Sequence, residues 1–252
     1  MEGKQIERYL IIADDFTGAN DTGVQLARRG YQTKVVFDSR GVLMDGLNYV
    51  LDTESRSVKP QQAYDKTQQM LKNIPLVGFN YLIKKIDSTL RGNVAAETRA
   101  VDEVFKSELI IFMPAFPDLK RTTVNGIHYL NGVRITETEL AHDPKTPVHE
   151  DRLNKLMEEF FEEPVKCIGL EQIHTGNIFF SGARVFCCDA QTNQDMQRVI
   201  GAALGTKKRV LWVGTAAMAD NLLSQKTAVP PALAVVASVS DTARAQVRYA
   251  AN

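Results

Sequence analysis

Charged and hydroxyl side chains follow three apolar runs of the sequence, and together they could bind a small charged ligand. Asp14 and Asp15 follow the apolar run 10–13, and Lys84–Gly92, which combines basic, acidic and hydroxyl side chains, closes a second run. Arg56 stands in the equivalent position after a third run. Arginine can hold a carboxylate through two parallel hydrogen bonds, and carboxylates accept hydrogen bonds from hydroxyl groups. The combination suits a small, polyhydroxylated, anionic ligand.

The two adjacent aspartates are expected to have different roles. Asp14 and Asp15 lie on an extended segment, so their side chains should point in different directions. One of them is expected to cap the helix that begins near Phe16, a common role for Asp, and the other to face the ligand. Asp21, in the first helical turn, would then only favour the helix dipole.

The segment 84–92 carries the richest combination of functional groups. If the strand extends to Asp87, then Lys85 and Asp87 share one face while Lys84 lies on the other. Ser88 stands where a helix cap is expected, so backbone amides there could hold an anion, and Arg91 lies within the same turn. As alternatives, Ser88 is a plain cap, Arg91 forms a surface ion pair, and the arginine after the third run is a solvated loop residue. The coincidence of all these groups at a strand–helix junction favours a site.

The elements that position these residues alternate between strand and helix. This order predicts an α/β fold, with a mostly parallel, doubly wound sheet and helices on both faces. In such a sheet the ligand binds at the carboxyl edge of the strands, where three of the polar strand ends would converge. The predicted strands are 10–13, 33–37, 49–52, 81–86, 109–113, 165–168, 184–188 and 210–213, and the main helices follow at 16–29, 59–71, 94–105, 151–161, 194–203 and 215–223.

The segment 114–147 interrupts this alternation. It is rich in turn-forming residues, and Asn131-Gly132 between apolar residues predicts a hairpin. We expect a hairpin and long loop lying over the ligand edge, because long ordered loops tend to be functional. Arg121 and His128 lie in this segment and could complete the pocket from above.

Composition restricts the class of protein. The 252 residues include 30 basic and 30 acidic side chains, and this lack of net charge argues against a nucleic-acid or membrane-surface partner. No apolar run approaches the ~20 residues of a membrane span, and the first residues lack the apolar core of a signal peptide. Three cysteines are too few for a disulfide framework, so free thiols and a cytoplasmic location are expected.

Several common site motifs are missing from these residues. No Walker A sequence, no Gly-x-Gly-x-x-Gly after the first strand, and no Gly-x-Ser-x-Gly elbow is present. His142-Asp143 and His149-Glu150 do not have the spacing of a zinc site, so no metal site is predicted. Pro230-Pro231 is typical of a linker. We therefore expect a main domain over 1–229, followed in 230–252 by the first strand and helix of a second domain whose remainder is missing.

The motifs together resemble the four-carbon acid sugar kinases, which phosphorylate threonate, erythronate and oxo-tetronate. The resemblance rests on five motifs: Ala13–Ala19, Lys85–Gly92, Pro114–Pro117, Arg121–Gly132 and His142–Pro147. It implies an acid-sugar site in the N-terminal domain and a nucleotide site in the C-terminal domain. By this likeness Asp15, Arg56, Lys85 and Asp87 match acid-sugar contacts, and Ser238 and Ser240 lie on the opening strand of the ATP domain.

The leading hypothesis is therefore the substrate-binding part of an ATP-dependent kinase, a transferase of carbohydrate metabolism that acts on a four-carbon acid sugar. ATP and Mg²⁺ would bind mainly through the missing domain, so the chain alone is expected to lack activity. A homo-oligomer is consistent with this hypothesis. The rival hypothesis is a non-catalytic acid-sugar binding module, and a metal-dependent hydrolase is a weaker third. Asp15 is the candidate base. The predicted substrate-binding residues are Asp14, Asp15, Arg56, Lys84, Lys85, Asp87, Ser88 and Arg91.

Overall fold

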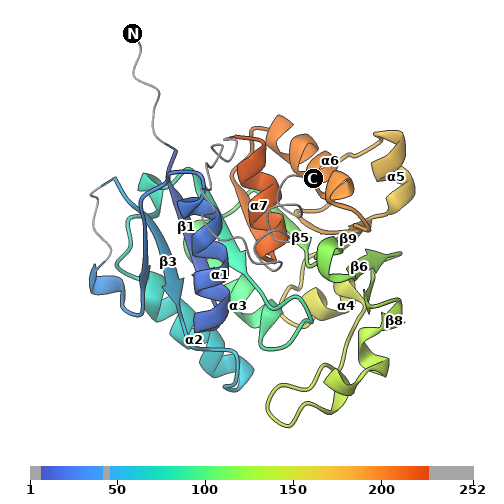
Figure 1. The fold of residues 1–252 in the computed structure, drawn as a ribbon, viewed down its shortest axis with the longest axis horizontal. Coiled ribbons are helices and arrows are strands. Elements are labelled where there is room, and N and C mark those ends of the chain that lie inside the picture. Colours follow the sequence, from blue (N-terminus) through green and yellow to red (C-terminus); the bar gives the residue numbers. More distant parts are fainter. Residues whose placement is uncertain (1–6, 42–45, 227–252) are drawn as a thin grey trace, which may run out of the picture.

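The computed structural model describes residues 7–41 and 46–226 of the chain (Figure 1). Eight strands form one sheet in the order β2-β3-β1-β4-β11-β5-β10-β9, and every neighbouring pair is parallel. This arrangement confirms the predicted α/β fold. The strands of this sheet are β1 (Tyr9–Ala13), β2 (Thr33–Val36), β3 (Asn48–Asp52), β4 (Tyr81–Lys85), β5 (Leu109–Met113), β9 (Val165–Ile168), β10 (Val185–Cys188) and β11 (Val210–Gly214).

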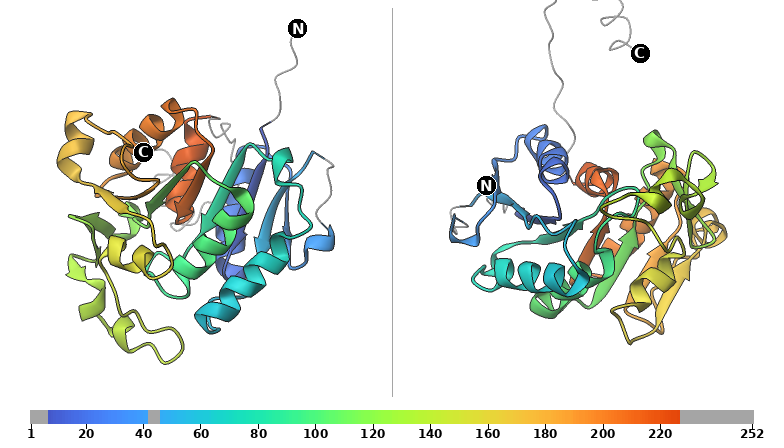
Figure 2. Two further views of the ribbon diagram at one scale, coloured as in Figure 1. Left: turned by 180° about the vertical axis from the view of Figure 1, so that it is seen from behind. Right: turned by 90° about the horizontal axis from the view of Figure 1, so that it is seen from below.

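Helices cover both faces of the sheet, because alternate residues of each strand point to opposite sides. Tyr9 and Ile11 pack in a cluster with residues of α1, α5, α6 and α7, whereas Leu10 and Ile12 pack in a second cluster with α2, α3 and α4. Figure 2 shows α1 and α7 on one side of the sheet and α2 and α3 on the other. The helices are α1 (Phe16–Ala27), α2 (Pro60–Leu71), α3 (Val94–Phe105), α4 (Leu153–Glu158), α5 (Leu170–Thr175), α6 (Asn193–Gly205) and α7 (Ala216–Ser224), and short 3₁₀ helices lie at Ser39–Gly41, Leu76–Gly78, Pro117–Leu119, Ile135–Glu137 and Glu139–His142.

The strand order places a topological switch point at β1. The chain runs from β1 to β2 and β3 on one side, and then crosses to β4 on the other side of β1. The carboxyl ends of β3, β1 and β4 therefore lie next to one another. In open α/β sheets such a switch point is where ligands bind.

The interruption after β5 forms a small antiparallel sheet in the order β6-β7-β8, consisting of β6 (Arg121–Val124), β7 (Ile127–Leu130) and β8 (Val133–Arg134). The predicted hairpin is confirmed, with positive φ angles of 52° at Asn131 and 82° at Gly132. A second hairpin, which was not predicted, joins β6 to β7 through Asn125-Gly126 with φ angles of 53° and 73°. Both turns use the same Asn-Gly pair because these residues tolerate positive φ.

The small sheet is tied to the carboxyl edge of the main sheet. The backbones of Thr123 and Ala190 exchange hydrogen bonds of 2.9 and 3.1 Å. Asp189, at the end of β10, accepts bonds from the backbone amides of Asn125 and Gly126 at 2.7 and 2.9 Å. The excursion therefore lies against the ligand edge, as predicted.

Further features of the described residues match the sequence analysis. Cys167, Cys187 and Cys188 are free thiols, and the last two belong to the clusters on opposite faces of the sheet. Among the helices of residues 7–41 and 46–226, none has the length and apolar character needed to cross a bilayer.

Helix α5 was not predicted. The expected linker and second-domain segment, 230–252, lie outside the described residues.

Gly214, the last residue of β11, offers a test of the close packing at this edge. A Cβ atom added there would lie 2.5 Å from the carbonyl oxygen of Met113 and 2.9 Å from Cβ of Met218. We expect Gly214→Ala to lower the free energy of unfolding by about 1–3 kcal/mol, measured by urea denaturation, because the neighbouring backbone must shift.

Gly205→Ala is the matched control for this substitution. Nothing lies within 4 Å of an added Cβ at this position in the last turn of α6. The control is expected to leave stability unchanged or to raise it by up to about 1 kcal/mol. Equal losses in both variants would contradict the packing argument.

Candidate functional site

A hollow of about 280 Å³ lies at the carboxyl edge of the sheet, at the switch point. Its lining comes from the ends of β1, β4 and β11, the start of α1, the loop after β3, and the strand β6. Segments far apart in the sequence therefore meet here. Six of the predicted site residues line the hollow: Asp15, Arg56, Lys85, Asp87, Ser88 and Arg91.

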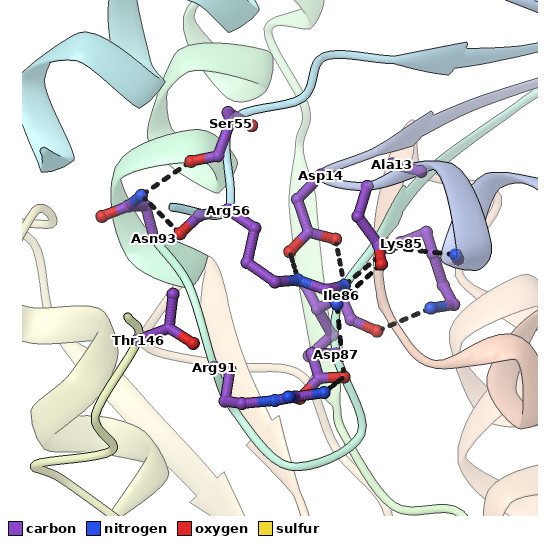
Figure 3. Close-up of polar contacts among 12 residues, drawn as sticks. Ala13, Asp14, Ser55, Arg56, Lys85, Ile86, Asp87, Arg91, Asn93 and Thr146 are labelled. Atoms are coloured by element: carbon purple, nitrogen blue, oxygen red, sulfur yellow. Dashed lines mark hydrogen bonds and ion pairs between the residues drawn. The ribbon is translucent and has the colours of Figure 1, made fainter. Parts of the chain in front are cut away.

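Arg56 is the centre of the polar contacts at this edge (Figure 3). Its Nε and Nη2 atoms donate to the two oxygens of Asp14 at 2.7 and 2.9 Å. Nη1 and Nη2 donate to the two oxygens of Asp15, both at 2.7 Å, and Oδ1 of Asp87 lies 3.7 Å from Nη1. Burial by itself would lower the pKa of Arg56, but the hydrogen bond and charge of Asp14 raise it above its ordinary value. Arg56 is thus a permanent cation that joins the ends of β1, β3 and β4.

The two aspartates divide their roles differently from the prediction. Asp15 is the N-cap of α1, where Oδ1 accepts a hydrogen bond from the amide of Gly18 at 2.9 Å, and it also lines the hollow. Asp14 is buried against Arg56 and does not line the hollow. One residue therefore combines the capping position with exposure to the hollow. Of the two carboxylates, that of Asp15 is the one that borders the hollow.

Gly18 permits the close approach of α1 to Asp15 and Lys85. A Cβ added to Gly18 would lie 2.6 Å from Oδ1 of Asp15 and 2.8 Å from Nζ of Lys85. The Lys85 ammonium group donates to the carbonyl oxygen of Ile86 at 3.0 Å. Burial lowers the pKa of Lys85, and the nearby charges of Asp14 and Asp87 oppose that decrease. Lys85 is therefore a desolvated amine at the wall of the hollow.

Asp87 and Arg91 form a second ion pair at the hollow. Arg91 donates from Nε to Oδ2 of Asp87 at 2.9 Å and from Nη2 to Oδ1 at 3.1 Å. Burial would raise the pKa of Asp87, but the hydrogen bonds from Arg91 and Thr89 and the charge of Arg56 lower it. Asp87 is consequently ionised at neutral pH, and most of its hydrogen-bonding capacity is already used.

Lys84 lies on the opposite face of β4, as the alternation predicted, and the structure does not bring it to the hollow. Its Nζ lies 2.8 Å from Oε2 of Glu97 in α3, and both side chains are fully buried. Ser55 donates to the other Glu97 oxygen at 2.8 Å. Burial raises the pKa of Glu97, and the charge of Lys84 offsets part of that increase. The geometry assigns Lys84 to the packing of α3 on the sheet.

The predicted helix cap at Ser88 is wrong. Helix α3 begins at Val94, and its N-cap residue is Asn93, whose side chain donates to the carbonyl of Ser55 at 2.9 Å. The chain first turns through Leu90 and Gly92, which have positive φ angles of 59° and 91°. The segment 88–92 is therefore a loop, and no helix N-terminus lies at Ser88.

The small sheet contributes two residues to the surroundings of the hollow. His128 is fully buried, and its Nε2 donates to the carbonyl of Ser88 at 2.9 Å while Nδ1 lies 3.1 Å from Oγ1 of Thr123. Burial lowers the pKa of His128 to about 4, so the ring is neutral at neutral pH. Arg121, at the start of β6, lines the hollow directly. His128 therefore fixes the small sheet to the loop 88–92, and Arg121 reaches the site.

Thr215, which was not among the predicted site residues, also lines the hollow. Its hydroxyl donates to the carbonyl oxygen of Ala115 at 2.8 Å. Thr215 stands two residues after the apolar run 210–213, with only Gly214 between them, and so carries a signal similar to the one that marked Asp14 and Asp15. The rule that polar strand ends meet at one edge would have included it.

A second hollow, of about 290 Å³, lies beside the first and shares Arg56 with it. Lys145, Thr146 and His149 line it from the long loop, and the start of α3 lines it from the sheet side. No other predicted site residue borders this space. The predicted residues therefore define the first hollow as the candidate site.

The described residues hold no cluster of side-chain ligands for a metal ion. Within 7–41 and 46–226, no group of three or more His, Cys, Asp or Glu side chains is placed to hold a metal ion. Asp15 and Asp87 are already held by arginine side chains. Ser238 and Ser240, the predicted nucleotide contacts, lie outside the described residues. No chemical step through ATP or Mg²⁺ follows from this part of the chain.

Residues 9–222 match the family described as the sugar-binding N-terminal domain. The chain belongs to this family. A D-threonate kinase from Salmonella typhimurium is 34% identical over 258 residues, which cover 95% of this chain and 60% of the relative. A D-erythronate kinase from Heliobacterium modesticaldum is 31% identical, with coverage of 98% and 61%. The resemblance to the four-carbon acid sugar kinases is thereby confirmed.

A solved structure of a domain of unknown function from Bordetella bronchiseptica, a domain-swapped dimer with bound citrate, has a similar fold. Its TM-score is 0.75 and its identity 28%, covering 97% of this chain and 64% of that chain. The chain spans about 60% of the length of the two curated relatives, 60% and 61% respectively. It thus corresponds to the sugar-binding part of those longer proteins.

The buried ion pair between Lys84 of β4 and Glu97 of α3 gives a test of the structural role of Lys84 in this sugar-binding domain. Lys84→Met leaves the Glu97 carboxylate buried without its partner, so we expect the free energy of unfolding to fall by about 3–5 kcal/mol. The double variant Lys84→Met/Glu97→Met removes both charges and should lose much less. Urea denaturation of the three proteins measures both effects. Wild-type stability in the single variant would contradict the structural role.

His128 predicts a pH dependence of stability. The unfolded chain binds a proton at this ring near pH 6.5, whereas the folded protein binds it only near pH 4. The contribution of His128 to the free energy of unfolding is fully present above about pH 6.5 and is lost as the pH falls toward 4. The pKa difference between the unfolded and folded states, 6.5 minus about 4, corresponds to a contribution of about 3 kcal/mol to the free energy of unfolding.

His128→Gln should reduce this loss, because glutamine keeps a donor for the Ser88 carbonyl but does not titrate. Unfolding free energies measured at pH 7 and pH 4.5 give the comparison. The exposed His149 changed to Gln is the control and should retain the wild-type difference. An unchanged difference in His128→Gln would show that other groups carry the acid sensitivity.

Proposed function

We propose that this chain is the substrate-binding part of an ATP-dependent kinase that phosphorylates a four-carbon acid sugar. The observation that carries the proposal is the hollow at the switch point, in which carboxylates and cations from β1, β3 and β4 converge. Membership of a sugar-binding family and the names of the longer relatives, D-threonate kinase and D-erythronate kinase, support it.

The side chains around the hollow suit a polyhydroxylated acid. Asp15 is the carboxylate that accepts the hydroxyl proton in this proposal, because it lines the hollow whereas Asp14 is buried behind it. Lys85 and Arg91 supply positive charge, and Asp87 and Ser88 supply hydrogen-bonding groups. Arg56 holds the carboxylates of Asp14 and Asp15 in place, and in this proposal it also contacts the ligand, because it lines the hollow.

Phosphoryl transfer depends mainly on positioning and on neutralising charge. In this proposal the described residues orient the acid sugar, and ATP with Mg²⁺ is held by other residues of the protein. ATP, Mg²⁺, the cytoplasmic location and a homo-oligomer stay predictions. The domain-swapped dimer of the Bordetella bronchiseptica protein supports testing the oligomeric state of this one.

The expected ligand response separates acids from polyols. Threonate or erythronate at about 100 times its dissociation constant should raise the thermal midpoint by about 5–10 °C, because a ligand bound only by the folded state stabilises it. The neutral tetritols threitol and erythritol have the same carbon chain without the acid group and should have a much smaller effect. Differential scanning fluorimetry measures both. Equal stabilisation by tetritols would contradict an acid site.

Addition of Mg²⁺–ATP to the acid-bound chain tests where the nucleotide binds. We expect acid binding with little or no phosphorylated product from the 252 residues alone. Turnover at rates usual for kinases, about 1–100 per second, would place the nucleotide site within these residues. Absence of acid binding, with or without ATP, would overturn the proposed function itself.

A further inference from the structure

The charges that line the hollow are not equally available to a ligand. Two of its four cations are already paired: Arg56 with Asp14 and Asp15, and Arg91 with Asp87. The third, Lys85, donates to a carbonyl oxygen, and burial lowers its pKa. An incoming carboxylate would have to compete with these internal partners.

Arg121 is the fourth cation, and it differs from the other three. Its Nε atom is buried and has no hydrogen-bond partner. Among residues 7–41 and 46–226, no carboxylate forms an ion pair with its guanidinium group. A buried donor without an acceptor is unfavourable, and a ligand oxygen that accepted from it would remove that cost. The structure therefore leaves this guanidinium available.

The backbone of Arg121 is held on several sides. Arg121 and Phe116 exchange backbone hydrogen bonds of 2.8 and 3.1 Å at the start of β6. The same small sheet is fixed through the backbone pair of Thr123 with Ala190 and through the bond from His128 to the carbonyl of Ser88. The guanidinium is thus carried on a rigid element, as precise recognition requires.

We propose that Arg121 binds the carboxylate of the acid ligand and determines the preference for an acid over a neutral polyol. This inference rests on the proposed acid-sugar function. A planar guanidinium can donate two parallel hydrogen bonds to a carboxylate, and a charge-assisted pair is stronger than a bond to a neutral group. The hydroxyl end of the ligand then lies toward Asp15, whose carboxylate lines the same hollow.

The test compares threonate and erythronate with their neutral amides, which keep the carbon chain and the hydroxyls. Calorimetry on the full chain is expected to give wild-type binding of an acid with a clear preference over its amide. Arg121→Met should weaken acid binding about tenfold or more and abolish that preference. Arg121→Lys retains charge but not the planar fork, and should give an intermediate affinity.

Lys120→Met is the matched control. Lys120 is exposed and does not line the hollow. Its replacement by Met removes one positive charge, as Arg121→Met does, at the neighbouring position in the sequence. It should keep the wild-type affinity for the acid and the preference over the amide. A loss in Lys120→Met equal to that in Arg121→Met would show a long-range charge effect and overturn the inference.

The outcomes distinguish this inference from the proposed function. If the wild-type chain binds neither acid, the proposed function fails. If it binds an acid and both Arg121 variants retain wild-type affinity and preference, only the assignment of Arg121 fails. Should Arg121→Met prove unfolded by circular dichroism, the affinity of Arg121→Lys decides: an unchanged value overturns the assignment, and a weakened one supports it.

Discussion

The candidate site depends on the guanidinium group of Arg56, which joins the ends of three parallel strands. It forms four hydrogen bonds with Asp14 and Asp15, between 2.7 and 2.9 Å, from a side chain that is 15% exposed. Two adjacent carboxylates would repel each other at this edge, and the positive charge of the shared guanidinium offsets that repulsion. Because the charges of the site are arranged before a ligand binds, little reorganisation is needed on binding.

Adjacent lysines on β4 separate the support of the fold from the site. Lys84 is directed to one face, where it pairs with Glu97 of α3, and Lys85 to the other, where it borders the hollow. A buried ion pair contributes little net stability, since desolvation offsets the attraction, but loss of one partner is costly. The pair therefore favours one placement of α3 on the sheet, and the loop 88–92 is positioned between that helix and β4.

Much of the fold could be predicted because apolar runs of four or five residues identify buried strands, and the polar residues after them mark the ligand edge. Asp15, Lys85 and Asp87 were found in this way. Helix α3 lies at its predicted residues, but Ser88 was wrongly expected to cap it, because the turn between them depends on Leu90, a non-glycine residue with a φ of 59° that no local signal indicates. Strand order also lies beyond a local pattern, so the place of β11 between β4 and β5 required the structure.

The small sheet completes the site as a fixed wall. Its strands are attached by the carboxylate of Asp189, by the backbone of Asp151 and by the ring of His128, all of which are buried. A flexible loop would lose conformational entropy when it closed on a ligand, whereas a wall that is already ordered loses little. Selectivity at Arg121 would then come from the charge of the acceptor, because a carboxylate forms a charge-assisted pair with the guanidinium that is stronger than a hydrogen bond to a neutral oxygen.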